Sequence, residues 1–282
     1  MQFGINTWVW GSSLTVDKLE RLTDKTVEMG YDVIEIPLED HDDLDYDRAA
    51  EVVRSAGLDV TTAAVMAPER DLVHPEADKR ETGEQYLRDA IDATATLGGG
   101  TLVGPIYSST GRLWQMDAEE RDTTERELAE TLRSLSEYAE TRDVTLCVEP
   151  LNRFETSLIN TTEQGIHLVD SVDHPSCQLL LDTFHMNIED KDVPAAIRSA
   201  DRRMGHVHAC ANDRGTPGTG HIRWSEIGRA LDDVNFDGAV VVESFTPDVE
   251  SIAKAASVWR PLAPDQDELA RDGLAHLRDT LG

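Results

Sequence analysis

The sequence contains little lysine. Only five of its 26 basic residues are lysine, whereas 55 residues are Asp or Glu, and the formal net charge is −29. A surface this acidic repels nucleic acid at ordinary ionic strength, so we expect no nucleic-acid partner. The acidic residues are spread along the whole chain, and the shortage of lysine is the reverse of the Lys/Glu enrichment of hyperthermophilic proteins. We therefore interpret the composition as the surface of a halophilic protein.

The halophile interpretation predicts that stability depends on salt. At about 1 M salt the Debye length is only about 3 Å, so repulsion among surface carboxylates is screened. We expect the thermal unfolding midpoint to fall as molar KCl is removed, and circular dichroism melts across a salt series would measure this. An ordinary acidic protein, the alternative, would unfold at the same temperature throughout the series.

Cysteine is scarce and long apolar runs are absent. Cys147, Cys177 and Cys210 lie in or beside strand-like segments without CxxC spacing, so the sequence suggests neither a disulfide framework nor a zinc knuckle. No stretch approaches the roughly 18 apolar residues of a membrane helix, and the first residues lack the basic and apolar regions of a signal peptide. We expect a soluble, cytoplasmic protein with buried, unreactive thiols and no membrane partner.

Short apolar, β-branched runs do recur along the chain, separated by longer stretches of helical periodicity. This alternation is typical of a parallel sheet wrapped by helices. The runs predict eight strands, at residues 2–6, 32–37, 58–65, 100–104, 144–149, 178–182, 204–208 and 239–243.

Eight such units predict a (β/α)₈ TIM barrel, a fold that typically takes about 250 residues. We expect one barrel domain over 1–282, because no segment has the composition of a linker. Helices are predicted at 15–30 and 123–142. The last helical region should be in two pieces, because Pro261 and Pro264 interrupt it.

Four consecutive predicted strands end in a polar residue that can bind a metal. They end in Glu149, Asp182, His208 and Glu243, at separations of 33, 26 and 35 residues. The carboxyl ends of barrel strands meet in one mouth, so these side chains should converge there. Three carboxylates and one imidazole suit one divalent ion, with Mn²⁺ preferred and Mg²⁺ or Co²⁺ as alternatives. The alternative is that each residue caps the helix that follows it.

Longer motifs around these residues resemble the ketose 3-epimerase family. They are VEPLNRFETSLINT at 148–161, LLLDTFHMNIED at 179–190, GHVHACANDRGTPGTGH at 205–221, VVVESF around Glu243, and GPIYSSTGR at 104–112. The resemblance covers essentially the whole chain. It implies a xylose-isomerase-like barrel, a small ketose as substrate, a homodimer or homotetramer, and metal ligands at the four strand-end positions.

Inversion of carbon 3 of a ketose requires a base on one face and an acid on the other. Glu149 and Glu243 are the outermost of the four ligands, so they can lie on opposite sides of a substrate. We expect them to be the catalytic pair, with roles that exchange with the direction of the reaction. The sequence leaves open which Glu acts as the base first.

The resemblance further implies that His185 and Arg214 bind oxygens at carbons 1 and 2, and that Glu155 orients one of them or a catalytic carboxylate. A helix cap and a surface ion pair are the alternatives for His185 and Arg214. His206 is predicted to be a hydrogen-bonded core residue. At other strand ends, the residues predicted to contact substrate are Asn6, Trp8, Glu35, Met66 and Tyr107, and Trp8 and Trp10 could instead simply pack beneath a loop.

Three other functions fit parts of the sequence. A hydroxypyruvate isomerase, or an inosose isomerase or dehydratase, could use the same metal and two Glu residues. An apurinic-site endonuclease shares the barrel, but it needs several metals and a basic DNA-binding face. A metal-binding barrel without catalysis is the third. The EPLNRFE motif favours the epimerase.

Overall fold

The computed structural model describes residues 1–39 and 44–282, apart from the side chains of residues 251 and 252. The described residues form a closed barrel of parallel strands in which each strand pairs with the next and β8 pairs with β1. The strands are β1 Gln2–Asn6, β2 Val33–Pro37, β3 Asp59–Ala63, β4 Thr101–Gly104, β5 Thr145–Val148, β6 Cys177–Asp182, β7 Met204–Ala209 and β8 Ala239–Val242. The predicted TIM barrel is confirmed.

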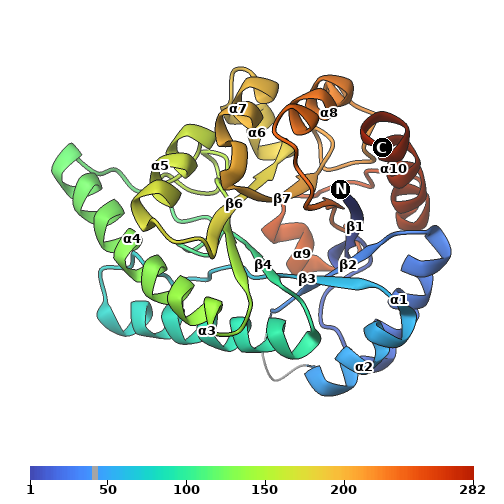
Figure 1. Ribbon diagram of the computed structural model, residues 1–282, viewed down its shortest axis with the longest axis horizontal. Coiled ribbons are helices and arrows are strands. Elements are labelled where there is room, and N and C mark those ends of the chain that lie inside the picture. The colour runs from blue at the N-terminus through green and yellow to red at the C-terminus, as the bar shows by residue number, and fades with distance from the viewer. Residues whose placement is uncertain (40–43) are drawn as a thin grey trace.

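Helices surround the strands (Figure 1). They are α1 Val16–Met29, α2 Tyr46–Ala56, α3 Ala77–Leu97, α4 Ala118–Glu140, α5 Thr162–Val172, α6 Thr183–Glu189, α7 Val193–Ala200, α8 Trp224–Asp233, α9 Glu250–Ala255 and α10 Gln266–Leu281, with short 3₁₀ turns η1 Thr7–Val9 and η2 Asp201–Arg203. The two final pieces, α9 and α10, are those predicted from the prolines between them. No helix in the described ranges is long and apolar enough to cross a membrane.

The helices begin where their sequences offer caps. The side chain of Thr15 accepts a hydrogen bond from the backbone N–H of Lys18 at the start of α1. Thr161 and Gln164 form a capping box at the start of α5, in which each side chain bonds the other's backbone. These caps fix the residue at which the strand-to-helix loop ends. They therefore set how many residues of that loop lie over the barrel mouth.

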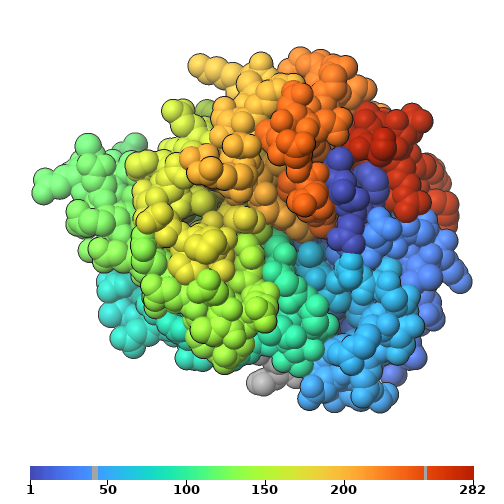
Figure 2. Space-filling view, viewed as in Figure 1, coloured from blue at the N-terminus to red at the C-terminus, as the bar shows by residue number. Residues whose placement is uncertain are grey.

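The first and last segments of the chain close the barrel. β1 pairs with β8 from Gln2↔Ala239 to Ile5↔Val242, and α10 packs against both strands. Figure 2 shows the N-terminal segment, in dark blue, beside the C-terminal helix, in red. The barrel therefore joins residues from both ends of the sequence around one interior.

β5 and β8 each end one residue before the position predicted for them. Pro150 follows Glu149 and has no N–H for the strand ladder, which explains the end of β5. Glu149 still donates its N–H to the carbonyl of Gly104 on β4 at 3.0 Å. Glu149 and Glu243 thus stand at the rim, immediately beyond the last ladder residues.

Gly104 at the end of β4 lies against the neighbouring strand segment. Its φ is +126°, and a Cβ there would be 2.3 Å from the carbonyl oxygen of Ala64. Gly104 also lines the cavity at the barrel mouth. The close approach of two backbones therefore shapes the wall of that cavity.

We predict that Gly104→Ala lowers the free energy of unfolding by about 3 kcal/mol, because it adds backbone strain of roughly 1–3 kcal/mol and a steric clash. Urea unfolding in high salt would measure the change. Gly98→Ala is the matched control, since Gly98 has a φ of +84° but open space around it. We expect it to cost only about 1 kcal/mol. Equal losses in the two variants would contradict the steric explanation.

Candidate active site

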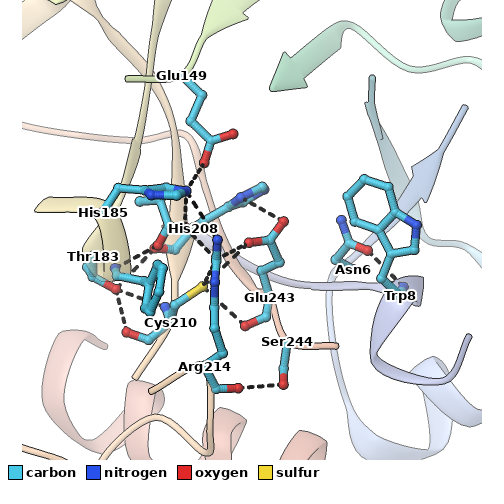
Figure 3. Close-up of polar contacts among 12 residues, drawn as sticks. Asn6, Trp8, Glu149, Thr183, His185, His208, Cys210, Arg214, Glu243 and Ser244 are labelled. Carbon is cyan, nitrogen blue, oxygen red and sulfur yellow. Dashed lines mark hydrogen bonds and ion pairs between the residues drawn. The ribbon is translucent and has the colours of Figure 1, made fainter. Parts of the chain in front are cut away.

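The four predicted metal ligands converge at the mouth of the barrel. Asp182, His208 and Glu243 each place a ligand atom within 4.8 Å of the others, and Asp182 does so with Glu149 and His185 as well. All five side chains are buried. Figure 3 shows Glu149 approaching His185 from one side of this cluster and Glu243 lying on the other. The structure therefore brings together the set that the strand ends predicted.

The orientation of His208 is fixed from β2. Its Nε2 lies 2.8 Å from Oε1 of Glu35, which also accepts a hydrogen bond from Asn6 at 2.9 Å. Burial would raise the pKa of Glu35, but His208 and His206 hold it well below its usual range. Glu35 is therefore ionised and can only accept, so the proton of His208 that it binds is the one on Nε2.

This leaves Nδ1 of His208 available as a ligand atom. It is buried, has no hydrogen-bond partner among the described residues, and lies 3.4 Å from Oε1 of Glu243. Burial would lower the pKa of His208, but the charges of Glu243 and Glu35 raise it well above its usual range. The same charges favour a proton on Nδ1, and a metal that bound to this nitrogen would take the place of that proton.

The carboxylates themselves are strongly perturbed. Burial, together with the charges of Glu243 and Asp182, raises the pKa of Glu149 well above its usual range. Burial also raises the pKa of Asp182. For Glu243 burial acts in the same direction, but the positive charges of His208 and Arg214 outweigh it and the pKa is lowered. Carboxylates crowded together in this way bind a cation favourably because it removes their mutual repulsion.

The residues present therefore fit one divalent metal. Three carboxylates and Nδ1 of His208 give an oxygen-rich set with one nitrogen, which suits Mn²⁺, Mg²⁺ or Co²⁺. Cys210 lies nearby, but its Sγ is 3.2 Å from the carbonyl oxygen of Glu243 and burial raises the pKa of its thiol, so it is not a thiolate ligand. The other two thiols, Cys147 and Cys177, are buried as predicted.

His185 is the fifth member of the cluster, and its tautomer follows from Asn152. The backbone N–H of Asn152 donates to Nδ1 of His185 at 3.0 Å, so Nδ1 is an acceptor. Burial and the charges of Arg214 and His208 lower the pKa of His185, which keeps the ring neutral. A neutral ring has one proton, which must be on Nε2, so His185 presents an N–H donor to the site and not a metal-binding lone pair.

Glu155 is held in place by the same asparagine. The amide of Asn152 donates to Oε1 of Glu155 at 2.7 Å, and burial raises the pKa of this carboxyl group. Glu155 lines the cavity together with His185. Asn152 was not singled out in the sequence, although it lies within the EPLNRFE motif.

Arg214 is buried, so it is not the surface ion pair that was the alternative. Its Nη1 donates to Oδ2 of Asp182 at 2.6 Å and to Oε2 of Glu243 at 2.5 Å. Its guanidinium lies over the rings of Phe184 and Phe245, at 4.1 and 5.1 Å. Arg214 thus supplies positive charge within the carboxylate cluster.

A cavity of about 350 Å³ opens over this cluster, near the lower end of the size range of small-molecule sites. Its lining includes the predicted residues Glu149, Glu155, His185, His208, Arg214, Glu243 and Trp8. The Trp8 indole N–H donates to Glu39 at 2.7 Å, and its ring lies 5.7 Å from that of Phe245. Trp8 therefore forms part of the cavity wall, whereas the indole N–H of Trp10 donates to Asp267 at 2.7 Å.

Four residues predicted to contact substrate lie elsewhere in the described structure. Asn6 and Glu35 are fully buried and bond each other beneath His208. The Met66 side chain packs against Gly83 on α3, and the Tyr107 hydroxyl donates to the carbonyl of Ile159 at 3.1 Å. These four are absent from the cavity lining, and their contact with substrate stays a prediction.

The reason that these residues lie outside the cavity lining is one for Asn6 and Glu35 and another for Met66 and Tyr107. Asn6 and Glu35 point into the barrel, but they lie one layer below the cavity. There the Thr61 hydroxyl and Nε2 of His206 lie 2.9 and 3.0 Å from Oε2 of Glu35. His206 is thus buried beside Glu35, as predicted for a core histidine. Met66 and Tyr107 lie in loops beyond β3 and β4, where strand alternation no longer sets the direction of a side chain.

Several cavity residues were not predicted. Phe245 follows Glu243 by two positions, in the segment beyond β8 where strand alternation no longer sets the direction of a side chain. Leu38, Glu39 and Arg70 come from loops after β2 and β3, and no sequence signal marks them. Loop residues of this kind depend on the path of the backbone and not on a periodic pattern.

The chain is similar to known proteins over almost its whole length. The family described as "Xylose isomerase-like TIM barrel" matches residues 23–280. A probable ketose 3-epimerase of Synechocystis sp. is 34% identical over 280 residues, covering 99% of this chain and 96% of its own. The chain belongs to the ketose 3-epimerase family. It is a sugar epimerase, and hence an isomerase.

Other members of the ketose 3-epimerase family are similar over nearly the whole chain. An L-ribulose 3-epimerase of Mesorhizobium japonicum is 34% identical over 278 residues, covering 98% of this chain and 93% of its own. A solved L-ribulose 3-epimerase structure has a TM-score of 0.93 and 33% identity, with 99% of this chain and 94% of that one covered. A D-allulose 3-epimerase from Methylomonas sp., solved with D-allulose, has a TM-score of 0.93 and 27% identity, with 99% and 97% covered.

Proposed function

We propose that this protein inverts carbon 3 of a free ketose of the D-allulose/D-fructose, D-tagatose or L-ribulose type. The observation that carries the proposal is the pair Glu149 and Glu243, buried at the ends of β5 and β8 and both facing one cavity that also exposes His208. A base and an acid on two sides of one carbon are the minimum that inversion requires. The family to which the chain belongs supports the same reaction.

Glu149 and Glu243 carry out the two proton transfers at carbon 3, one on each face. One carboxylate removes it from carbon 3, which leaves an enediolate, and the other returns a proton to the opposite face. Their roles reverse with the direction of the reaction. Because both are buried, bulk water is kept from the reacting carbon, and the proton can be held at a carboxylate oxygen between the two steps.

The metal would be held by Glu149, Asp182, His208 and Glu243. When bound, a divalent ion supplies Lewis-acid stabilisation of developing negative charge, worth several kcal/mol. We propose Mn²⁺ as the ion. Glu35 keeps His208 in the ligating tautomer through the contact at 2.8 Å.

His185 and Arg214 hold the ketone end of the sugar. The Nε2–H of His185 and the guanidinium of Arg214 are the donors at the edge of the carboxylate cluster, and both line the cavity. Glu155, fixed by Asn152, accepts from a sugar hydroxyl group. The Trp8 ring supplies an apolar face on which sugar C–H groups can pack.

We further propose that residues 1–282 form a single domain that assembles as a homodimer or homotetramer in the cytoplasm. Size-exclusion chromatography with light scattering, in molar salt, would measure the mass. A monomer at micromolar concentration would contradict the assembly.

One experiment tests the reaction. Protein loaded with Mn²⁺ is incubated in D₂O and high salt with D-fructose, D-allulose, D-tagatose and L-ribulose, and the products are followed by NMR. We expect the C3 epimer with deuterium at carbon 3. Aldose labelled at carbon 1 or 2 would instead indicate an isomerase, and no exchange with any ketose would contradict the proposal.

A further inference from the structure

We propose that Glu39 forms the far end of the sugar site and selects the substrate there. Its carboxylate accepts a hydrogen bond from the terminal hydroxyl group of the ketose, and its charge excludes a ketose that carries a phosphate on that carbon. The inference rests on the proposed epimerase function and deepens it, because it names a residue that decides which ketoses the site accepts.

The cavity extends from one side of the barrel mouth to the other. His185 lies on α6, directly after β6, and Glu39 lies two residues beyond the end of β2, and both line the cavity. In a closed ring of eight strands in sequence order, β2 lies opposite β6. In Figure 3, Trp8, which contacts Glu39, lies across the cluster from His185. A ketose whose ketone end is held beside His185 therefore extends its other end toward Glu39.

The carboxylate of Glu39 is held by two neutral donors. Its Oε1 accepts the indole N–H of Trp8 at 2.7 Å, and its Oε2 accepts the backbone N–H of Ser13 at 3.0 Å. A carboxylate offers about four acceptor positions, so about two remain unused. Glu39 is thus an oriented acceptor in the cavity wall that still has room for a donor from the substrate.

Glu39 forms no salt bridge with any residue that the structure describes. Two basic side chains lie near it, but both bind backbone carbonyl groups. The guanidinium of Arg70 donates to the carbonyls of Glu39 and Val65 at 3.3 and 3.2 Å. Nζ of Lys18 donates to the carbonyl of Ser12 at 2.6 Å. The negative charge of the Glu39 carboxylate therefore stays at the cavity wall without an ionic partner.

These properties define the chemical group that fits beside Glu39. A sugar hydroxyl group is uncharged and has a proton to donate, so it can form a charge-assisted hydrogen bond with the carboxylate. A phosphate dianion has only acceptor oxygens, and its charge repels the carboxylate. This end of the cavity therefore accepts a free ketose and disfavours a ketose phosphate.

A purely structural role for Glu39 would have a different effect on the sugars. Through Trp8 and Ser13 it would only hold the cavity wall in place, so its loss would weaken the binding of every ketose by the same factor. A residue that bonds one hydroxyl group instead changes the discrimination between a sugar with that group and a sugar without it.

The test compares kcat/KM for two sugars in Mn²⁺-loaded protein at high salt. One is the ketose that is epimerised fastest, and the other is its analogue without the terminal hydroxyl group. We expect the unsubstituted protein to prefer the hydroxylated sugar by about ten- to a hundredfold, the usual effect of a hydrogen bond to a charged group. In Glu39→Met this preference should fall to about one, and in Glu39→Gln it should be intermediate. Every protein is given the same two sugars, so differences in ring opening cancel.

Two further variants serve as controls. Trp8→Phe removes the indole N–H from Oε1 of Glu39 but leaves the carboxylate, so the preference should persist even where turnover falls. Glu51→Gln removes an exposed carboxylate from α2 and should change neither the preference nor the turnover. An unchanged preference in both Glu39 variants would overturn the inference and leave the epimerase proposal intact.

A ketose phosphate tests the charge of Glu39 separately. For the terminal phosphate of the same ketose we expect kcat/KM at least about a hundredfold below that of the free sugar, and at least about a tenfold recovery in Glu39→Gln. A preference of the unsubstituted protein for the phosphate would overturn the inference and assign this end of the cavity to Arg70 as an anion site. No exchange with any ketose would overturn the inference and the proposed function together.

Discussion

Replacement of Glu243 with glutamine is expected to reduce turnover by at least 10²–10⁴-fold, the usual range for loss of a positioned acid or base. Glutamine keeps the size of the side chain and an oxygen that can still ligate a metal, but it cannot accept the proton from carbon 3. Turnover of the preferred ketose at saturating Mn²⁺ would measure the loss. Glu149→Gln should have an effect of the same order, because inversion needs both faces.

The control for this experiment is a matched neutralisation at the surface. Glu226→Gln removes one carboxylate from the exposed start of α8 and should leave turnover unchanged. Mn²⁺ affinity must be measured for each variant, so that lost metal is not mistaken for lost proton transfer. Full turnover in Glu243→Gln with metal bound would refute the two-glutamate mechanism.

Replacement of Glu35 with glutamine is expected to cost about 3–5 kcal/mol of stability and 10–100-fold in metal affinity. Glu35 is fully buried and accepts from Asn6, Thr61 and His208. An amide NH₂ in place of one oxygen would face these donors. The positive charge of His208 would also lose its ionised partner. Urea unfolding and Mn²⁺ calorimetry would measure the two effects.

The control for Glu35→Gln is Glu51→Gln, which removes an exposed carboxylate from α2. It should change stability by less than about 1 kcal/mol. If Glu35→Gln bound Mn²⁺ with unchanged affinity, Glu35 would not be what fixes the ligating tautomer of His208. The loss of stability would then reflect burial alone.

The convergence of the proposed ligands could be predicted because it depends on strand periodicity and on one topological rule. Asp182 and His208 end apolar runs, and in a parallel barrel the carboxyl ends of all strands share one rim. Nothing about the loops is needed to bring such residues together. The same rule does not set the direction of Met66, which lies three residues beyond the end of β3 and packs against Gly83 on α3.

The second layer of the site could not be predicted in this way. The contact between Glu35 and His208 joins β2 to β7 across 173 residues, and it depends on the depth at which each side chain enters the barrel. The burial of Arg214 depends on a loop residue with a φ of +65°, which sequence patterns do not indicate. Depth and loop path follow from packing, and no short motif encodes them.

The residues of the site come from two separate parts of the barrel. All four proposed ligands lie at the carboxyl ends of β5 to β8, whereas Glu35, which orients His208, and Asn6, which supports Glu35, come from β2 and β1. Neither half of the chain could assemble an oriented ligand set on its own. We therefore expect metal affinity to report on the closure of the whole barrel, and a chain in which the two halves had separated to release a bound ion before it lost its individual strands.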